Sequence, residues 1–361
     1  MKSCLFLPFL FILCQGYIND FYINVTFPGY NATRSFIIDT IGDDDFIWQT
    51  KAYGGIIGEE NTFDEKKSKT YHGGGYYFRT DFVDGGKNCR IGGMMSIDDV
   101  SLLPYKNYNA YFGLAYNSTC GENALHRTTA FNGKVRAGRL SFRKFENPNQ
   151  RKVGLALVDT FPHNYLCLHQ SVTDDLKIRQ TAVAVGAKVA NNRVIGEIRY
   201  YKDSYWRVPA TTLKIGKTEY DVQPWSNLAT FDTTSDKITL PIKYFELVAN
   251  ATNAVYINET KKYMVDCGQE VALEIGLDKL RFKIQPTALL RREKADYTKC
   301  ELLLKPGTSR TSSYFTLGVP FFVNNGVCFG RLRMIFYNAK YDQNKPVFPD
   351  TWGAYLSIRN E

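Results

Sequence analysis

Two short segments, one in each half of the chain, share a pattern that limits what the chain can fold into. Residues 36–40 (FIIDT) and 228–233 (LATFDT) are apolar runs that end in an aspartate and a threonine. Each is followed, many residues later, by an apolar run that ends in glycine, at 111–113 and at 315–318. Two matches in the same order predict a duplicated domain, with a boundary within 184–193, where small and polar residues gather.

The composition favours strands. The chain contains 24 Tyr and 24 Phe besides many Val, Ile and Thr, which are residue types enriched in strands. A hairpin is predicted over 213–222, with Gly216 in its turn. A short helix is predicted after Pro241, because proline suits the first helical turn, and a second helix within 171–183. Further strand-like runs cover 21–27, 36–39, 153–158, 194–201, 280–284 and 332–336.

Many short strands in a chain of this length indicate an all-β fold with two β-barrel lobes. We place the first lobe at residues 17–190 and the second at 191–361.

The amino-terminal segment has the pattern of a secretory signal. Lys2 precedes an apolar run at 5–13, which is followed by residues 14–16 (CQG). We therefore expect a signal peptide over residues 1–16. No stretch is long enough to cross a bilayer, so a secreted monomer is expected, with the lysosome as the alternative destination. Five glycosylation sequons agree with the secretory route, and they begin at Asn24, Asn31, Asn117, Asn250 and Asn258.

Cysteine usage points to the same compartment. Removal of the signal takes away Cys4 and Cys14, and an even number of cysteines in an exported chain predicts disulfides throughout. The sequence alone leaves their pairing open. The remaining cysteines are Cys89, Cys120, Cys167, Cys267, Cys300 and Cys328.

Several function classes are disfavoured. The formal charge is +9, but its carriers are scattered, whereas nucleic-acid binding needs a concentrated basic stripe. Residues 43–45 (DDD) lack the alternating spacing of a calcium loop, and His163, Cys167 and His169 do not have the spacing of a zinc site. No Gly-x-Ser-x-Gly elbow is present, as a serine hydrolase would need. We expect no metal, no cofactor and no nucleic-acid partner.

Apolar strands that end in Asp-Thr, one per half, resemble those of the pepsin-like aspartic peptidases. The resemblance extends over nearly all of the mature chain and implies that family's bilobal fold with a central cleft. The segments that carry it are 21–27 (first strand), 78–86 (flap hairpin), 205–208 (start of the second lobe), 232–241 (second catalytic loop) and 263–267 with Cys300 (second-lobe disulfide).

The resemblance implies roles for the repeated residues. Asp39 and Asp232 would face each other across the cleft, hold a water and share one proton, because two adjacent carboxylates cannot both ionise easily. One would accept a proton from the water while the other donates one to the substrate carbonyl. Thr40 and Thr233 would cross-link the two loops. Ser235 would support the second loop.

The resemblance also implies a disulfide between Cys267 and Cys300. Cys89 with Cys120 is then the expected bond within the first lobe. Cys167 with Cys328 follows by elimination.

The catalytic loops depart from the family pattern. The family has glycine at the third loop position, where this chain has Ile41 and Thr234, and β-branched residues do not readily adopt the backbone conformations open to glycine. We expect these side chains to interfere where the loops meet, unless Gly42 slides into the place of the missing glycine. The first loop is also about two residues longer than in the family, and its added carboxylates at 43–45 would raise the pKa of a nearby dyad.

Two further departures lie outside the loops. The flap tyrosine, which would hydrogen-bond toward Trp48, is replaced by Phe82. The first strand follows the predicted signal so closely that no blocking pro-segment is expected.

Two functions are consistent with these residues. The chain is either an aspartic endopeptidase with impaired activity or a catalytically inactive relative. Either would hold a peptide or protein in the cleft between the lobes.

Overall fold

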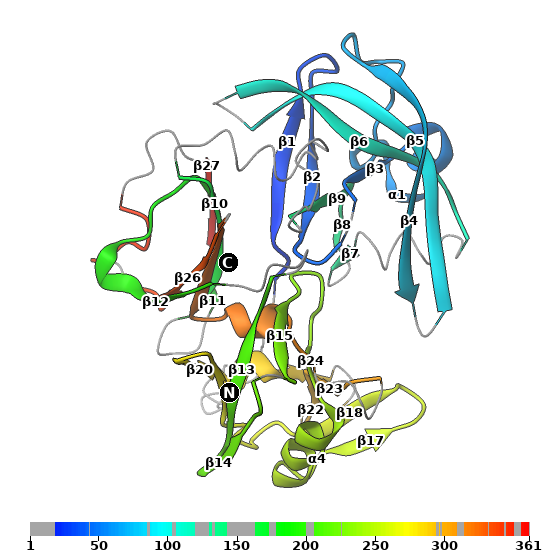
Figure 1. Ribbon diagram of the computed structural model, residues 1–361. Helices are drawn as coiled ribbons and strands as arrows, with labels where there is room; N and C mark the ends of the chain where they lie inside the picture. Colours follow the sequence, from blue (N-terminus) through cyan, green and yellow to red (C-terminus); the bar gives the residue numbers. More distant parts are fainter. Residues whose placement is uncertain are drawn as a thin grey trace, which may run out of the picture.

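The computed structural model describes residues 19–42, 44–84, 87–102, 106–119, 130–131, 134–142, 163–172, 178–199, 206–224, 226–293, 296, 298–308, 314–330, 332–342, 344–349 and 355–360. Within these residues the fold is built almost entirely of strands (Figure 1). The predicted all-β class is therefore confirmed.

The first lobe is built on a seven-stranded sheet, drawn in blue and cyan in Figure 1. Alternate residues of its first strand, Ile23, Val25 and Phe27, are buried, as expected for a strand with one face on the core. In order across the sheet, the strands are β1 (Tyr22–Phe27), β2 (Ala32–Asp39), β9 (Gly138–Ser141), β3 (Phe46–Trp48), β6 (Lys106–Ser118), β5 (Lys87–Leu102) and β4 (His72–Asp84). A separate pair consists of β7 (Ala130–Phe131) and β8 (Lys134–Val135).

The second lobe contains an eight-stranded and a four-stranded sheet. The larger consists of β20 (Leu280–Ile284), β19 (Leu273–Leu277), β13 (Arg207–Ile215), β15 (Leu228–Phe231), β24 (Tyr314–Leu317), β16 (Ile238–Leu240) and β23 (Leu304–Pro306), with β14 (Thr218–Asp221) paired to β13. The smaller consists of β17 (Val255–Ile257), β18 (Lys262–Asp266), β22 (Lys299–Leu302) and β21 (Leu290–Arg292). The strands of these sheets do not close into a barrel. The predicted β-barrels are therefore open sheets.

A six-stranded sheet takes strands from both halves of the sequence and lies on the left of Figure 1. The proposed lobe boundary at 190 falls among its strands. They are β12 (Val194–Ile198), β26 (Met334–Asn338), β25 (Asn325–Gly330), β10 (Tyr165–Val172), β11 (Ile178–Val185) and β27 (Tyr355–Asn360).

Helices are few and short. The predicted helix after Pro241 is α4 (Ile242–Ala251), which buries Tyr244, Phe245 and Val248. The other described helix is α1 (Thr50–Ile57). Single 3₁₀ turns are η1 (Glu59–Asn61), η2 (Asn191–Arg193), η3 (Pro286–Leu289) and η4 (Val319–Phe322). Among the described residues, no helix is both long and apolar enough to cross a membrane.

One hydrophobic core runs through both lobes. The ring of Phe21, at the start of the first lobe, meets that of Phe322 at 5.2 Å between centroids. Trp206, at the entry to the second lobe, donates its indole N–H to the carbonyl of Phe142 at 2.8 Å. The lobes therefore share a packed boundary.

The disulfide predictions are confirmed for the two bonds whose cysteines both lie within the described residues. Cys167 is bonded to Cys328 across β10 and β25, and Cys267 is bonded to Cys300 in the second lobe. Cys89 is also disulfide-bonded, but its expected partner, Cys120, lies outside the described residues.

Two local predictions are wrong. No helix is found among the described residues of 171–183. Residues 171–172 end β10 and residues 178–183 lie in β11, and the two strands pair with each other. The run 111–113 lies in β6, where it pairs with β5, and its Gly113 also pairs with β3, so it is not the counterpart of 315–318. That place belongs to β9, which pairs in parallel with β2 as β24 pairs in parallel with β15. The strand predicted at 153–158 lies outside the described residues.

Candidate active site

The two repeated aspartates occupy equivalent places in the two lobes. Asp39 ends β2 beside the parallel strand β9, opposite Ser141. Asp232 directly follows β15, which lies beside the parallel strand β24. Asp39 is 2% exposed and Asp232 is 8% exposed. Both carboxyl groups are thus carried on rigid strand ends and withdrawn from bulk water.

Thr40 and Thr233 join the two loops through reciprocal hydrogen bonds. The Thr40 hydroxyl donates to the carbonyl of Phe231 at 2.7 Å, and the Thr233 hydroxyl donates to the carbonyl of Ile38 at 2.5 Å. Each backbone N–H donates to the other threonine's Oγ1, at 3.3 and 3.2 Å. Since each acceptor carbonyl precedes an aspartate, these bonds fix the backbone on which both carboxyl groups are mounted. The predicted cross-link is present.

The first loop closes on Asp39 through two backbone amides. Its Oδ1 accepts from the N–H of Ile41 at 3.0 Å and from that of Gly42 at 2.7 Å. A Cβ on Gly42 would lie 2.3 Å from Oδ2 of Asp39, so only glycine allows this approach. Gly42 takes the place of the missing glycine, as the sequence analysis considered.

The second loop closes without a glycine. Oδ1 of Asp232 accepts from the Thr234 N–H at 2.9 Å and from the Thr234 hydroxyl at 2.7 Å. Neither Ile41 nor Thr234 has a positive φ, so neither needs a backbone conformation reserved for glycine. The expectation that these residues interfere between the loops is therefore wrong. Thr234 instead supplies a second donor to Asp232.

Within the acidic insertion at 43–45, Asp45 is bonded to β9. Asp45 is buried, and its Oδ1 accepts from the Ser141 N–H at 2.5 Å. The Ser141 hydroxyl in turn donates to the carbonyl of Gly42 at 2.5 Å. Asp45 thereby anchors the longer loop to β9. Asp43 lies outside the described residues.

Arg139 is a site residue that the sequence analysis missed. It lies in β9, and its Nη1 is 3.0 Å from Oδ2 of Asp39. Both oxygens of Asp39 therefore accept hydrogen bonds within the protein. A charged residue between Gly138 and Leu140, in an otherwise uncharged strand, was the signal available in the sequence.

The electrostatics of the two aspartates differ. The pKa of Asp232 is raised above its usual value, mainly by burial and then by the negative charge of Asp39. The donors on Thr234 and the positive charge of Arg139 oppose this rise. Asp232 therefore keeps its proton to higher pH than an ordinary aspartic acid does.

Of the two residues predicted for the flap, Phe82 and Trp48, only Trp48 has a described side chain. The hairpin of β4 and β5 is present, and the backbone of Phe82 pairs with Cys89, but the Phe82 side chain lies outside the described residues. Trp48 is fully buried and packs on Phe46 and Tyr53. It therefore contacts the protein interior and not an open binding surface.

Ser235 supports the second loop through the backbone. Its hydroxyl donates to the carbonyl of Lys237 at 2.8 Å, and its own carbonyl accepts from the Val319 N–H at 2.8 Å. Gly318, beside Val319, faces this turn. A Cβ on Gly318 would lie 2.2 Å from the Lys237 carbonyl oxygen and 2.6 Å from that of Ser235.

Substitution of Gly318 by alanine is expected to destabilise the protein by about 1–3 kcal/mol, because backbone would have to move to make room. Urea unfolding measures this. Gly268→Ala is the control, since a Cβ there meets nothing within 4 Å. Equal stabilities of the two variants would contradict the close packing of this turn.

The five asparagines of the sequons are all exposed: Asn24, Asn31, Asn117, Asn250 and Asn258. Their surface positions are accessible to glycosylation.

Comparison with known proteins bears on the second half of the chain. A family model described as eukaryotic aspartyl protease matches residues 181–331. The match includes Asp232, Thr233 and the Cys267–Cys300 disulfide, whereas Asp39 lies before it. No curated protein matches the chain.

Proposed function

Because residues 181–331 match a family model described as eukaryotic aspartyl protease, we propose that the chain is a slow aspartic endopeptidase of the pepsin-like type. It would hydrolyse peptide bonds with a water molecule activated between Asp39 and Asp232. The observation that carries this proposal is the reciprocal bonding of Thr40 and Thr233, which mounts both buried aspartates on one rigid backbone frame.

The raised pKa of Asp232 supports an assignment of roles. Asp232, whose pKa is raised by burial and by Asp39, would donate its proton to the oxygen of the scissile carbonyl. Asp39 would accept a proton from the attacking water. A tetrahedral intermediate would form, and its collapse with protonation of the amine would break the C–N bond. Peptide hydrolysis of this kind needs no metal or cofactor.

The contact between Arg139 and Asp39 is the reason that we propose a low rate of hydrolysis. Oδ1 of Asp39 already accepts from two backbone amides, and Oδ2 faces the Arg139 guanidinium at 3.0 Å. A carboxylate whose lone pairs are engaged by strong donors is a weaker acceptor for a proton from water. The chain would thus retain the dyad but weaken its base.

The same ion pair favours a second candidate function. If Arg139 holds Asp39 permanently, the chain would bind a peptide or protein between the lobes without cutting it. The test below separates these two functions.

An exported location belongs to the same proposal. The two disulfides, Cys167–Cys328 and Cys267–Cys300, are compatible with an oxidising compartment, and the exposed sequons fit the same route. We place the protein outside the cell as a monomer, with the lysosome as the alternative.

Substitution of Asp232 by asparagine is expected to lower the rate of peptide cleavage by about 10²- to 10⁴-fold, because it removes the general acid. A quenched fluorescent peptide library assayed across the acidic range measures this. Asp221→Asn is the control, since Asp221 is an exposed residue of β14. Cleavage that survives Asp232→Asn would belong to a contaminant and would refute the proposal. If neither the wild type nor the Asp221→Asn control cleaves any peptide, but both bind a pepstatin-type inhibitor, the second candidate function holds.

A further inference from the structure

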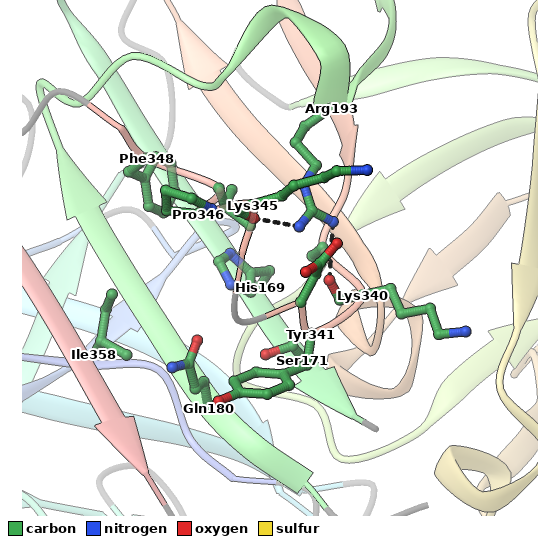
Figure 2. A pocket seen from close by; sticks show the side chains of 13 residues that line it. His169, Ser171, Gln180, Arg193, Lys340, Tyr341, Lys345, Pro346, Phe348 and Ile358 are labelled. Carbon is green, nitrogen blue, oxygen red and sulfur yellow. Dashed lines mark hydrogen bonds between the residues drawn. The ribbon is translucent and has the colours of Figure 1, made fainter. Parts of the chain in front are cut away.

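A cavity lies beside the six-stranded sheet and includes none of the dyad residues. Its volume is about 330 Å³, at the lower end of the range for small-molecule sites. One wall comes from β10, β11 and β27, where Ser171 lies directly opposite Gln180 and Ala182 opposite Ile358. A covering segment, made of residues 339–342 and 345–348, lines the other side (Figure 2).

Two polar side chains in the lining are buried and have atoms without a hydrogen-bond partner. Ser171 is 1% exposed and its hydroxyl oxygen has no partner. Arg193 is 8% exposed and its Nε–H has no partner. A buried donor without an acceptor is costly in a folded protein. Both side chains line the cavity, so a ligand that accepts hydrogen bonds and reaches them would supply the partner that they lack.

Arg193 also brings a positive charge to the cavity. Its Nη1 donates to the carbonyl of Lys340 at 2.9 Å, and its Nη2 donates to the carbonyl of Lys345. These bonds hold the covering segment over the cavity, but among the described residues no carboxylate forms an ion pair with this guanidinium. A buried cation without a counter-charge favours binding of an anion.

The remaining lining limits what that anion can be. Phe348, Val347, Pro346 and Ile358 provide apolar surface next to the polar groups. Figure 2 shows the ammonium groups of Lys340 and Lys345 extending away from His169 and Ser171, so Arg193 is the cation nearest the buried floor.

Asp342 also lines the cavity. Its carboxylate accepts from the Asn344 N–H at 3.0 Å. One inner cation, one acidic residue and apolar walls suit a singly charged, partly apolar ligand better than a phosphate dianion.

We propose that this cavity binds a small organic acid. Its carboxylate would accept hydrogen bonds from Arg193 Nε and the Ser171 hydroxyl. Its apolar body would lie against Phe348 and Ile358. The neutral imidazole of His169, held by the Tyr337 hydroxyl at 3.0 Å from Nδ1, completes the floor.

Benzoate is the probe, and benzamide is its uncharged counterpart of nearly the same shape. Calorimetric titration at constant ionic strength is expected to detect benzoate binding and to find benzamide and inorganic phosphate at least about tenfold weaker, since charge-assisted bonds and a monoanion are required. Ser171→Ala is expected to weaken benzoate binding by about tenfold. Arg193→Gln is expected to abolish it.

Lys217→Gln is the matched control, because it removes an exposed positive charge from the turn between β13 and β14. It should leave benzoate affinity unchanged. Ser171→Ala keeps the test valid if Arg193→Gln fails to fold, since the lost hydroxyl has no partner in the protein. The proposal is overturned if benzoate and hexanoate both fail to bind at about 10 mM, if benzamide binds as well as benzoate, or if Ser171→Ala binds like the wild type.

Discussion

Replacement of Arg139 with methionine is expected to raise kcat/KM for a peptide substrate by about 10- to 100-fold, the equivalent of one hydrogen bond to a charged group. The guanidinium engages Oδ2 of Asp39 at 3.0 Å. Methionine fills a similar volume but donates nothing, so this oxygen becomes available to accept a proton from water. Assays with the most responsive peptide of the library measure the gain.

The same substitution should change the pH profile. The positive charge of Arg139 lowers the pKa of Asp232, against the larger effects of burial and of Asp39 that raise it. Without Arg139 the pKa of Asp232 rises further, so the protonated acid persists to higher pH. The descending limb of the profile should therefore move toward neutral pH.

Arg136→Met is the matched control. Arg136 is also partly buried, and it pairs with Asp20 at 2.7 Å and not with Asp39. It should leave the pH profile in place. Arg139→Lys, which keeps the positive charge, should retain most of the suppression. If Arg139→Met is no more active than the wild type, Arg139 is not what restrains the dyad.

Acid is expected to destabilise the protein through one buried histidine. The pKa of His169 is lowered from 6.5 to about 3 by burial and by the nearby charge of Arg193. The unfolded chain takes up a proton as the pH falls below 6.5, whereas the folded protein does not until about pH 3. Stability is therefore complete above the unfolded pKa and falls by about 1.4 kcal/mol per pH unit below it.

The His169→Asn variant tests this contribution. Asparagine does not titrate and can still bond the Tyr337 hydroxyl, so the variant should lose about 3 kcal/mol less than the wild type between neutral pH and pH 4. Urea unfolding at a series of pH values gives the two slopes. His72→Asn, at an exposed position, should keep the wild-type slope. Parallel curves for His169→Asn and the wild type would contradict the prediction.

The core of the candidate site could be predicted from the sequence because it is encoded locally. An apolar strand that ends in Asp-Thr occurs in each half, and both copies fold as β2 and β15 with their aspartates at the strand ends. The need for glycine beside Asp39 was also visible, since Gly42 follows it closely. Short-range pattern was sufficient wherever neighbouring residues determine the geometry.

The features that were missed depend on contacts between distant segments. Arg139 reaches Asp39 across a sequence separation of 100, through parallel pairing that no local pattern reveals. A helix is predicted within 171–183 from local pattern alone, but pairing with β10 on one side and β27 on the other makes residues 178–183 part of a strand. At Thr234 the prediction failed for another reason: the hydroxyl adds a donor that glycine lacks.

The six-stranded sheet also has a consequence for biosynthesis. β10 and β11 are translated long before β25 and β27, and Cys167 precedes Cys328 by 161 residues. At ribosomal speeds this interval is roughly 10–30 s. During that time the early strands have unpaired edges and a reactive thiol, so newly made chains should depend strongly on chaperones and thiol isomerases to reach their final pairing.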